Sequence, residues 1–259
     1  MTVKGLVLSV FPGADLLGRG FTQAGYCVVR GGDPLFGQEP VEALHPPAGV
    51  FEGVIGGPPC QRWAQSHNLA GDKEKHPNLI PEFERVVWEA QPRWFLMENV
   101  RGAPVPAVEG YEMQTQVIYA WELGSPQRRP RRFSFGSRDG AMIMWPRGEK
   151  PPLGALTLVA KKDMTTLQRE VLPTLGTAPT SQRMRCGLRA WRDPENNTTA
   201  FTLAEYKRAF GLPESWDAKA LLKRSKFYVL GESVPVCVAY ALARVIRAAT
   251  SGETKLDER

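Results

Sequence analysis

The residues best suited to chemistry are a cysteine and a glutamate, each placed directly after a short apolar segment. Cys60 ends the run Gly56-Gly-Pro-Pro-Cys60, in which two prolines restrict the backbone before the thiol. A rigid, partly exposed thiol near basic groups is a common way to present a nucleophile. A buried packing cysteine is the alternative, and it is less natural after this Gly-Gly-Pro-Pro run. Glu98 follows the apolar residues 94–97, so we expect a half-buried carboxyl group with a raised pKa that can give a proton. A helix cap or a salt bridge would explain Glu98 equally well.

Two other segments could bind polar groups. Gln127-Arg-Arg-Pro-Arg131 precedes an apolar stretch and offers several guanidinium groups that could grip an oxygen atom or a carboxylate. Phe11-Pro-Gly-Ala-Asp15 follows an apolar segment, and its glycine would let the backbone approach a ligand closely. A strand–glycine–helix turn is more often only structural, so this second segment is a weak signal by itself.

The cysteines and histidines do not form a metal-binding pattern. The four cysteines are scattered without a C-x-x-C pair, and no histidine lies at ligand spacing from a cysteine. We therefore predict neither a metal site nor a disulfide scaffold. The chain of 259 residues also lacks a long apolar run and the layout of a signal peptide, so we expect a soluble, cytoplasmic protein without a membrane partner.

One part of the chain carries all of its positive excess. The whole sequence has a formal net charge of +6, whereas residues 128–192 contain 14 Lys+Arg and 4 Asp+Glu, a net charge of +10. The rest of the chain is therefore at −4. A solvated basic face is the ordinary explanation, but this concentration of charge favours a polyanion as partner.

The elements that must position these residues alternate between strand and helix. Apolar runs predict strands at Lys4–Phe11, Tyr26–Arg30, Gly49–Ile55 and Arg93–Met97, and helical periodicity predicts helices at 14–25, Pro81–Glu89, Thr202–Phe210 and Val236–Ala249. This alternation indicates an α/β fold with a doubly wound, mostly parallel sheet. Ligands of such sheets bind at the carboxyl ends of the strands, where the candidate residues stand.

Taken together and in this order, the segments resemble the DNA cytosine-5 methyltransferase family. Phe11-Pro-Gly-Ala14 resembles the family's first motif, Pro58-Pro-Cys-Gln61 its nucleophile motif, and Glu98-Asn-Val100 is identical to its Glu-Asn-Val. Gln127-x-Arg-x-Arg131 matches a further motif, and residues 201–213 and 231–236 resemble the last two. The resemblance implies a Rossmann-like class I methyltransferase fold that uses S-adenosylmethionine (SAM).

The resemblance also implies roles for the residues. Cys60 would add to C6 of a flipped cytosine, Glu98 would bind N3 and the exocyclic amine, and Arg131, supported by Arg129, would hold the O2 side. Residues 62–75 would close over the base. The implied SAM-binding residues are Phe11, Gly13, Ala14, Leu17, Asp33, Gly57, Pro59, Glu232, Ser233 and Val234. The implied DNA-binding residues are Pro59, Gln61, Asn99, Arg183, Arg185 and Arg189.

The donor motifs depart from the family's pattern at three places. Asp15 and Leu16 stand where the first motif has two glycines. Gly32 stands where a glutamate binds the cofactor ribose, with Asp33 next to it. Glu232 replaces the asparagine of the last motif, near the expected position of the methyl donor. Weaker SAM binding or a chemically modified SAM is therefore an alternative to plain SAM, and Glu232 would disfavour a donor with an extra carboxylate.

The resemblance also suggests the domain organisation. We expect residues 1–136 and 201–259 to form the catalytic domain, residues 137–200 a small target-recognition domain, and residues 250–259 a frayed tail. We predict a monomer that modifies double-stranded DNA, with a restriction endonuclease partner left open. A catalytically silent DNA-binding relative and an RNA cytosine methyltransferase are the other classes that the sequence allows.

Overall fold

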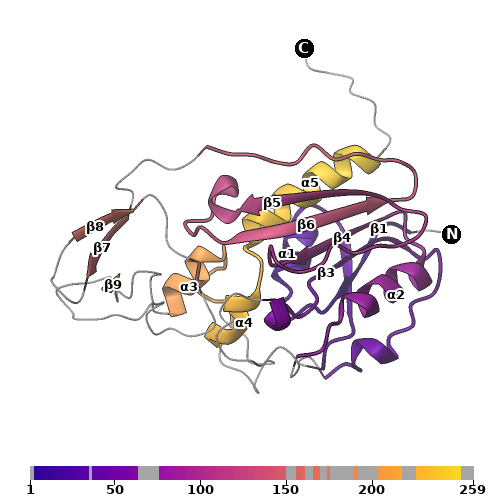
Figure 1. Ribbon diagram of the computed structural model, residues 1–259, viewed down its shortest axis with the longest axis horizontal. Coiled ribbons are helices and arrows are strands. Elements are labelled where there is room, and N and C mark those ends of the chain that lie inside the picture. Colours follow the sequence, from indigo (N-terminus) through magenta and orange to yellow (C-terminus); the bar gives the residue numbers. More distant parts are fainter. Residues whose placement is uncertain are drawn as a thin grey trace, which may run out of the picture.

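A six-stranded sheet forms the centre of the protein (Figure 1). The computed structural model describes residues 3–34, 37–63, 76–149, 156–160, 166–169, 174–175, 190–191, 203–217 and 226–251. The sheet has the order β2-β1-β3-β4-β6-β5, with β1 (Val3–Val10), β2 (Cys27–Gly31), β3 (Phe51–Gly56), β4 (Trp94–Asn99), β5 (Glu112–Tyr119) and β6 (Pro130–Ser137). β1 to β4 are parallel, whereas β6 runs antiparallel to both β4 and β5. The predicted α/β class is confirmed, in the form of a mixed sheet.

Helices cover both faces of the sheet because its central strands are apolar on both sides. In β4, Trp94 and Leu96 face one core together with α1 (Leu16–Gln23) and α5 (Val236–Thr250). The alternate residues Phe95 and Met97 face a second core that contains α2 (Ile80–Ala90). This is the pattern expected for strands that are buried on both faces.

A third core joins the C-terminal helices to the start of α1. It contains side chains of α3 (Leu203–Ala209), α4 (Lys226–Glu232) and α5, together with Leu16 and Leu175. The sequence did not predict α4. By length and composition alone, the stretch Lys226–Thr250 is apolar enough to span a membrane. However, 61% of its apolar 18-residue segment is buried inside the protein, as in a core helix.

The basic part of the chain contributes a second, smaller sheet. Its antiparallel strands β7 (Leu156–Ala160), β8 (Thr166–Arg169) and β9 (Ala190–Trp191) lie apart from the six-stranded sheet in Figure 1. Before this sheet, Ile143 is buried in the core of the large sheet, and its backbone exchanges two hydrogen bonds with the side chain of Gln114 on β5. That residues 137–200 form a small target-recognition domain remains a prediction.

The connections between strands place the candidate residues at one edge. From β1 the chain passes to β2 on one side of it and then to β3 on the other, which makes the β1–β3 boundary the switch point of the sheet. The carboxyl ends of β1, β2, β3 and β4 lead directly to Phe11, Gly32, Gly57 and Val100. Short 3₁₀ helices follow β2 and β3, at Val41–Ala43 (η2) and Gln61–Trp63 (η3), and another follows β5 at Ala120–Leu123 (η6).

Candidate active site

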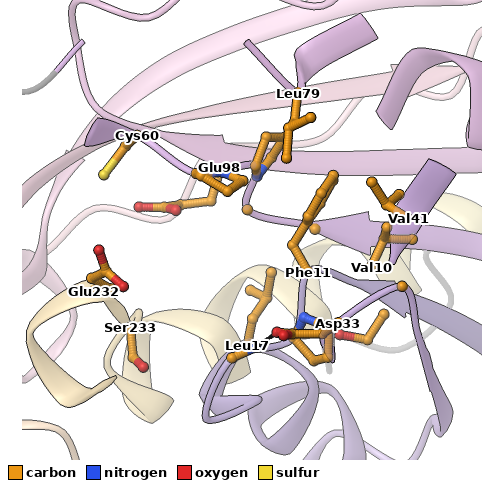
Figure 2. A pocket seen from close by; sticks show the side chains of 18 of the residues that line it. Val10, Phe11, Leu17, Asp33, Val41, Cys60, Leu79, Glu98, Glu232 and Ser233 are labelled. Carbon is orange, nitrogen blue, oxygen red and sulfur yellow. Dashed lines mark hydrogen bonds between the residues drawn. The ribbon is translucent and has the colours of Figure 1, made fainter. Parts of the chain in front are cut away.

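A cavity of about 520 Å³ lies at this edge of the sheet (Figure 2). It brings together most of the residues that the sequence singled out, which come from α1, β4, β6, α4 and the connections that follow β1, β2, β3 and α4. The predicted residues that line it are Phe11, Gly13, Leu17, Asp33, Gly57, Pro59, Cys60, Glu98, Arg131, Glu232, Ser233 and Val234. Among the described residues, no cluster of His, Cys, Asp and Glu side chains could hold a metal ion.

The turn after β3 fixes the position of Cys60. The Asn99 side chain is almost fully buried, and its Nδ2 donates to the carbonyl of Pro58 at 3.2 Å. The carbonyl of Cys60 accepts from Trp63 N at 2.9 Å, at the start of η3. Asn99 does not line the cavity; it braces the Pro58-Pro59 turn that presents the thiol.

Glu98 and Arg131 form a buried ion pair beside Cys60. Glu98 is only 7% exposed, and Arg131 Nε lies 2.9 Å from its Oε1. The pair places a carboxylate and a guanidinium group side by side in the cavity wall. Gly57 gives the carboxylate its room, because a Cβ atom there would approach Glu98 Oε2 to 3.1 Å.

At the Cys60 end of the cavity, burial favours the uncharged forms of the acidic side chains. Burial raises the pKa of Glu98, against the opposing charges of Arg131 and Arg129. Burial also raises the pKa of Cys60, and the Glu98 carboxylate raises it further, while Arg131 lowers it. These shifts favour the thiol form of Cys60 and the protonated form of Glu98.

The other end of the cavity combines an apolar wall with a buried carboxylate. Phe11 adopts a left-handed backbone conformation (φ 54°), which is unusual for a bulky residue, and its ring points between Leu79 and Val41 in Figure 2. Asp33 is 8% exposed, and its Oδ2 accepts from Gly13 N at 2.8 Å. This pairing suits a ligand with a flat apolar ring and neighbouring hydroxyl groups.

Asp15 stands where the family's first motif has a glycine, and the structure explains how the turn tolerates it. Asp15 adopts the left-handed conformation (φ 51°) that a glycine would adopt easily, and it caps α1 by accepting from Gly18 N at 3.2 Å. Its carboxylate also accepts from Ser9 Oγ at 2.9 Å and pairs with Arg30 at 2.5 Å. These contacts offset the strain, so the turn keeps its shape without the glycine.

Arg129 lies outside the cavity lining, in contrast to Arg131. Its guanidinium group is fully buried over the ring of Phe210 and donates to the carbonyls of Leu175 at 3.1 Å and Gly231 at 2.7 Å. Gln127 is also fully buried and accepts from the backbone N–H of Leu175 at 3.4 Å. Both residues therefore hold neighbouring backbone in place, and the charge of Arg129 also acts on Glu98 and Cys60. Support of Arg131 by Arg129 at the O2 side remains a prediction.

Several predicted residues are not brought into the cavity, and several others were missed. Ala14 packs against the third core. The side chain of Gln61, most of residues 62–75, and Arg183, Arg185 and Arg189 lie outside the described part of the chain. The cavity residues that the sequence did not single out include Val10, Val41, Leu79, Tyr228 and Val229, which are ordinary apolar residues without a chemical signature.

Comparison with known proteins identifies the family. The profile of the C-5 cytosine-specific DNA methylase family matches residues 45–178, just over half of the chain. The chain belongs to this family. The type II methyltransferase M.FnuDI of Fusobacterium nucleatum is 29% identical over 160 residues, which are 51% of this chain and 46% of that protein. M.MthTI of Methanothermobacter thermautotrophicus is 31% identical over 163 residues, 51% of this chain and 49% of that protein. This methylase-family chain thus spans about half the length of these curated relatives.

Solved structures agree on the fold of this methylase-family chain. A putative DNA modification methyltransferase encoded within an E. coli prophage superposes with a TM-score of 0.60 at 18% identity, covering 95% of this chain and 99% of that one. The S. pombe Dnmt2 methyltransferase gives a TM-score of 0.52 at 12% identity, covering 95% and 99%. At these identities the likeness establishes the class I methyltransferase fold alone.

Proposed function

We propose that this protein is a SAM-dependent DNA cytosine-5 methyltransferase. The observation that carries the proposal is the convergence of Cys60 with the Glu98–Arg131 pair at one end of a single cavity. A nucleophile, a proton donor and a cation for developing negative charge are the groups that a pyrimidine ring needs for activation at C5. Membership of the methylase family supports the same reaction.

The residues present fit SAM at the other end of the cavity. Phe11, Leu79 and Val41 would enclose the adenine ring, and the Asp33 carboxylate would accept from the ribose hydroxyls. Asp33 suits this role better than its neighbour, because Gly32 has φ 70° and a side chain there would meet the backbone of Val41 at 3.1 Å. SAM, when bound, supplies a methyl group on a positively charged sulfur.

The protein's own residues would then act on the cytosine. Cys60 would lose its thiol proton to solvent as its sulfur forms a bond to C6, while protonated Glu98 gives its proton to N3 and Arg131 stabilises charge on the O2 side. The ring electrons then reach C5, which takes the methyl group. Loss of the C5 proton to solvent, cleavage of the bond to the Cys60 sulfur and return of the N3 proton to Glu98 restore the aromatic ring and the free enzyme. Since C6 is inaccessible inside a duplex, the base must first be flipped into the cavity.

Double-stranded DNA is the proposed substrate, and the basic segment 128–192 is its proposed binding region. The net charge of +10 in that segment supports contacts with phosphates. A monomeric protein would suffice for these steps.

Nucleoside mass spectrometry on cells that produce the protein tests this proposal. We expect 5-methylcytosine in the DNA with the wild-type protein and none with Cys60→Ala. Methylated cytosine in RNA alone would favour the RNA-modifying alternative, and a heavier substituent at C5 would indicate a modified donor. No modification in either nucleic acid would contradict the proposal in favour of a silent DNA-binding relative.

A further inference from the structure

Among the residues that the structure describes, the reacting end of the cavity presents two carboxylates and one guanidinium group. Glu98 and Glu232 both line it, whereas Arg131 is the cation that lines it and is paired with Glu98. In Figure 2 the Glu232 carboxylate points across the cavity toward Cys60 and Glu98. A carboxylate in this position makes the space between these groups favourable for a positive charge.

The fold holds Glu232 firmly in this position. Glu232 is the last residue of α4, and the carbonyl of Gly231 just before it accepts from the buried Arg129 at 2.7 Å. Ser233, just after it, donates through its hydroxyl to the carbonyl of Val229 at 2.8 Å. The carboxylate is therefore held on a fixed backbone beside the reacting groups.

Glu232 is attracted by the charge of the buried Arg129 and lies at the negative end of α4. The C-terminal end of a helix carries partial negative charge from its carbonyl groups, so cations are the residues that stabilise this end. The charge of Glu232 also contributes to the raised pKa of Cys60, after burial and Glu98. A positively charged ligand group between Glu232 and Cys60 would be attracted by this carboxylate.

We propose that Glu232 is a specificity-determining residue that selects a donor with positive charge at its reacting sulfur over the neutral product of transfer. The inference rests on the proposed use of SAM. SAM carries a sulfonium, whereas S-adenosylhomocysteine carries an uncharged thioether at the same place and is otherwise identical. Glu232 therefore favours release of the product and its replacement by fresh donor.

Isothermal titration of the full-length protein with both ligands tests this inference. We expect Glu232→Gln to weaken SAM binding by roughly fivefold, the upper range for a solvent-accessible ion pair, while S-adenosylhomocysteine binds as before. Glu232→Asp keeps the charge and should retain most of the preference. Sinefungin, which carries a protonated amine in place of the sulfonium, should respond to Glu232→Gln as SAM does. Glu112→Gln, an exposed carboxylate on β5, is the matched control and should change neither affinity.

A second measurement needs no ligand. The rate at which iodoacetamide alkylates Cys60, followed by peptide mass spectrometry, should rise two- to threefold in Glu232→Gln, because one negative charge near the thiolate is removed. Glu98, Arg131 and Arg129 also act on this thiol and are unchanged in the variant.

The outcomes separate this inference from the proposed function. Equal loss of affinity for SAM and S-adenosylhomocysteine would overturn the inference, since Glu232 would then bind a group that both share. Unchanged affinities for both would overturn it as well. Failure of the wild-type protein to bind SAM at all would instead overturn the proposed donor.

Discussion

At the scale of single residues, Glu98 shows a conflict between function and stability. Burial, opposed by the charge of Arg131, raises its pKa, so ionising this group costs more in the folded protein than in the unfolded chain. Stability therefore falls as pH rises above the unfolded pKa of about 4.3 and through the folded pKa. A buried acid retained at this cost is consistent with a role in proton donation.

We therefore expect Glu98→Gln to be more stable and less active than the wild type. Its thermal midpoint at pH 8 should rise by a few degrees, and the gain should vanish at pH ~3, below the unfolded pKa, where the wild-type residue is protonated in both states. Methyl transfer should fall by about 100-fold or more, because a positioned acid is lost. Thermal unfolding across pH and single-turnover transfer measure these effects, with the exposed Glu112→Gln as control. A variant destabilised at pH 8 would contradict the account.

Asp33 and Gly32 give a second prediction at this scale. Asp33→Ala should weaken SAM binding by about tenfold or more, since a charge-assisted hydrogen bond contributes ~1.5–3 kcal/mol. Gly32→Glu should not strengthen binding, because Gly32 has φ 70° and lies against Val41. It should instead lower the thermal midpoint. Titration with SAM decides the point, and tighter binding by Gly32→Glu together with an unaffected Asp33→Ala would show that Asp33 has no such role.

At the scale of elements, Arg85 on α2 supports the cavity wall from behind. Its guanidinium group donates to the carbonyls of Val41 at 2.7 Å and Leu44 at 3.1 Å, while Glu82 and Glu89 on the same helix pair with it. Val41 begins η2 and lines the cavity. Arg85 thus connects α2 to the wall that would face the adenine ring.

Arg85→Met should therefore affect both stability and ligand binding. Two carbonyls lose their donor, so we expect a loss of ~1–2 kcal/mol of unfolding free energy and a severalfold weaker affinity for SAM. Chemical denaturation and titration measure the two effects. Arg244→Met, an exposed arginine on α5 that lies over Tyr240, is the control. An unchanged SAM affinity in a destabilised Arg85→Met would limit Arg85 to a structural role.

The sequence predicted the elements whose apolar pattern is dense. The predicted strand Arg93–Met97 is found as Trp94–Asn99, and the predicted helix Val236–Ala249 as Val236–Thr250. β5 was not predicted, because the edge strand Glu112–Tyr119 mixes polar and apolar residues. The seven-residue α4 was likewise too short for a recognisable period.

The candidate site was predictable where the chemistry of a residue is distinctive. Cys60, Glu98 and Arg131 stand out by type and place, and the structure brings them to one cavity. The position of Arg129 was not predictable, because its φ of 20° breaks the alternation of the strand that begins at Pro130. Its contacts with Leu175 and Gly231 also depend on chain packing that no local pattern encodes.

At the scale of the whole molecule, the separation of charge predicts how DNA would bind. The segment 128–192 carries +10 and the remainder −4. DNA affinity should therefore fall by ~0.9 log units per phosphate contact for each tenfold rise in salt. Replacing Arg183, Arg185 and Arg189 by Glu should weaken DNA binding and lower this slope, while SAM affinity is retained. Fluorescence anisotropy over a salt series measures both, with Arg244→Glu as control. Binding that is insensitive to salt and to these changes would rule out this segment as the DNA-binding region.

The central claim is that Cys60 attacks C6 of a cytosine in DNA, and trapping of the covalent intermediate tests it most directly. DNA that contains 5-fluorocytosine blocks the final loss of the C5 substituent, so the bond between protein and base cannot be broken. With SAM present, we expect a denaturation-resistant complex whose peptide mass spectrum places the nucleotide on Cys60. Cys60→Ala should give no complex while still binding DNA. A complex formed equally well by Cys60→Ala, or attached to another residue, would contradict the account.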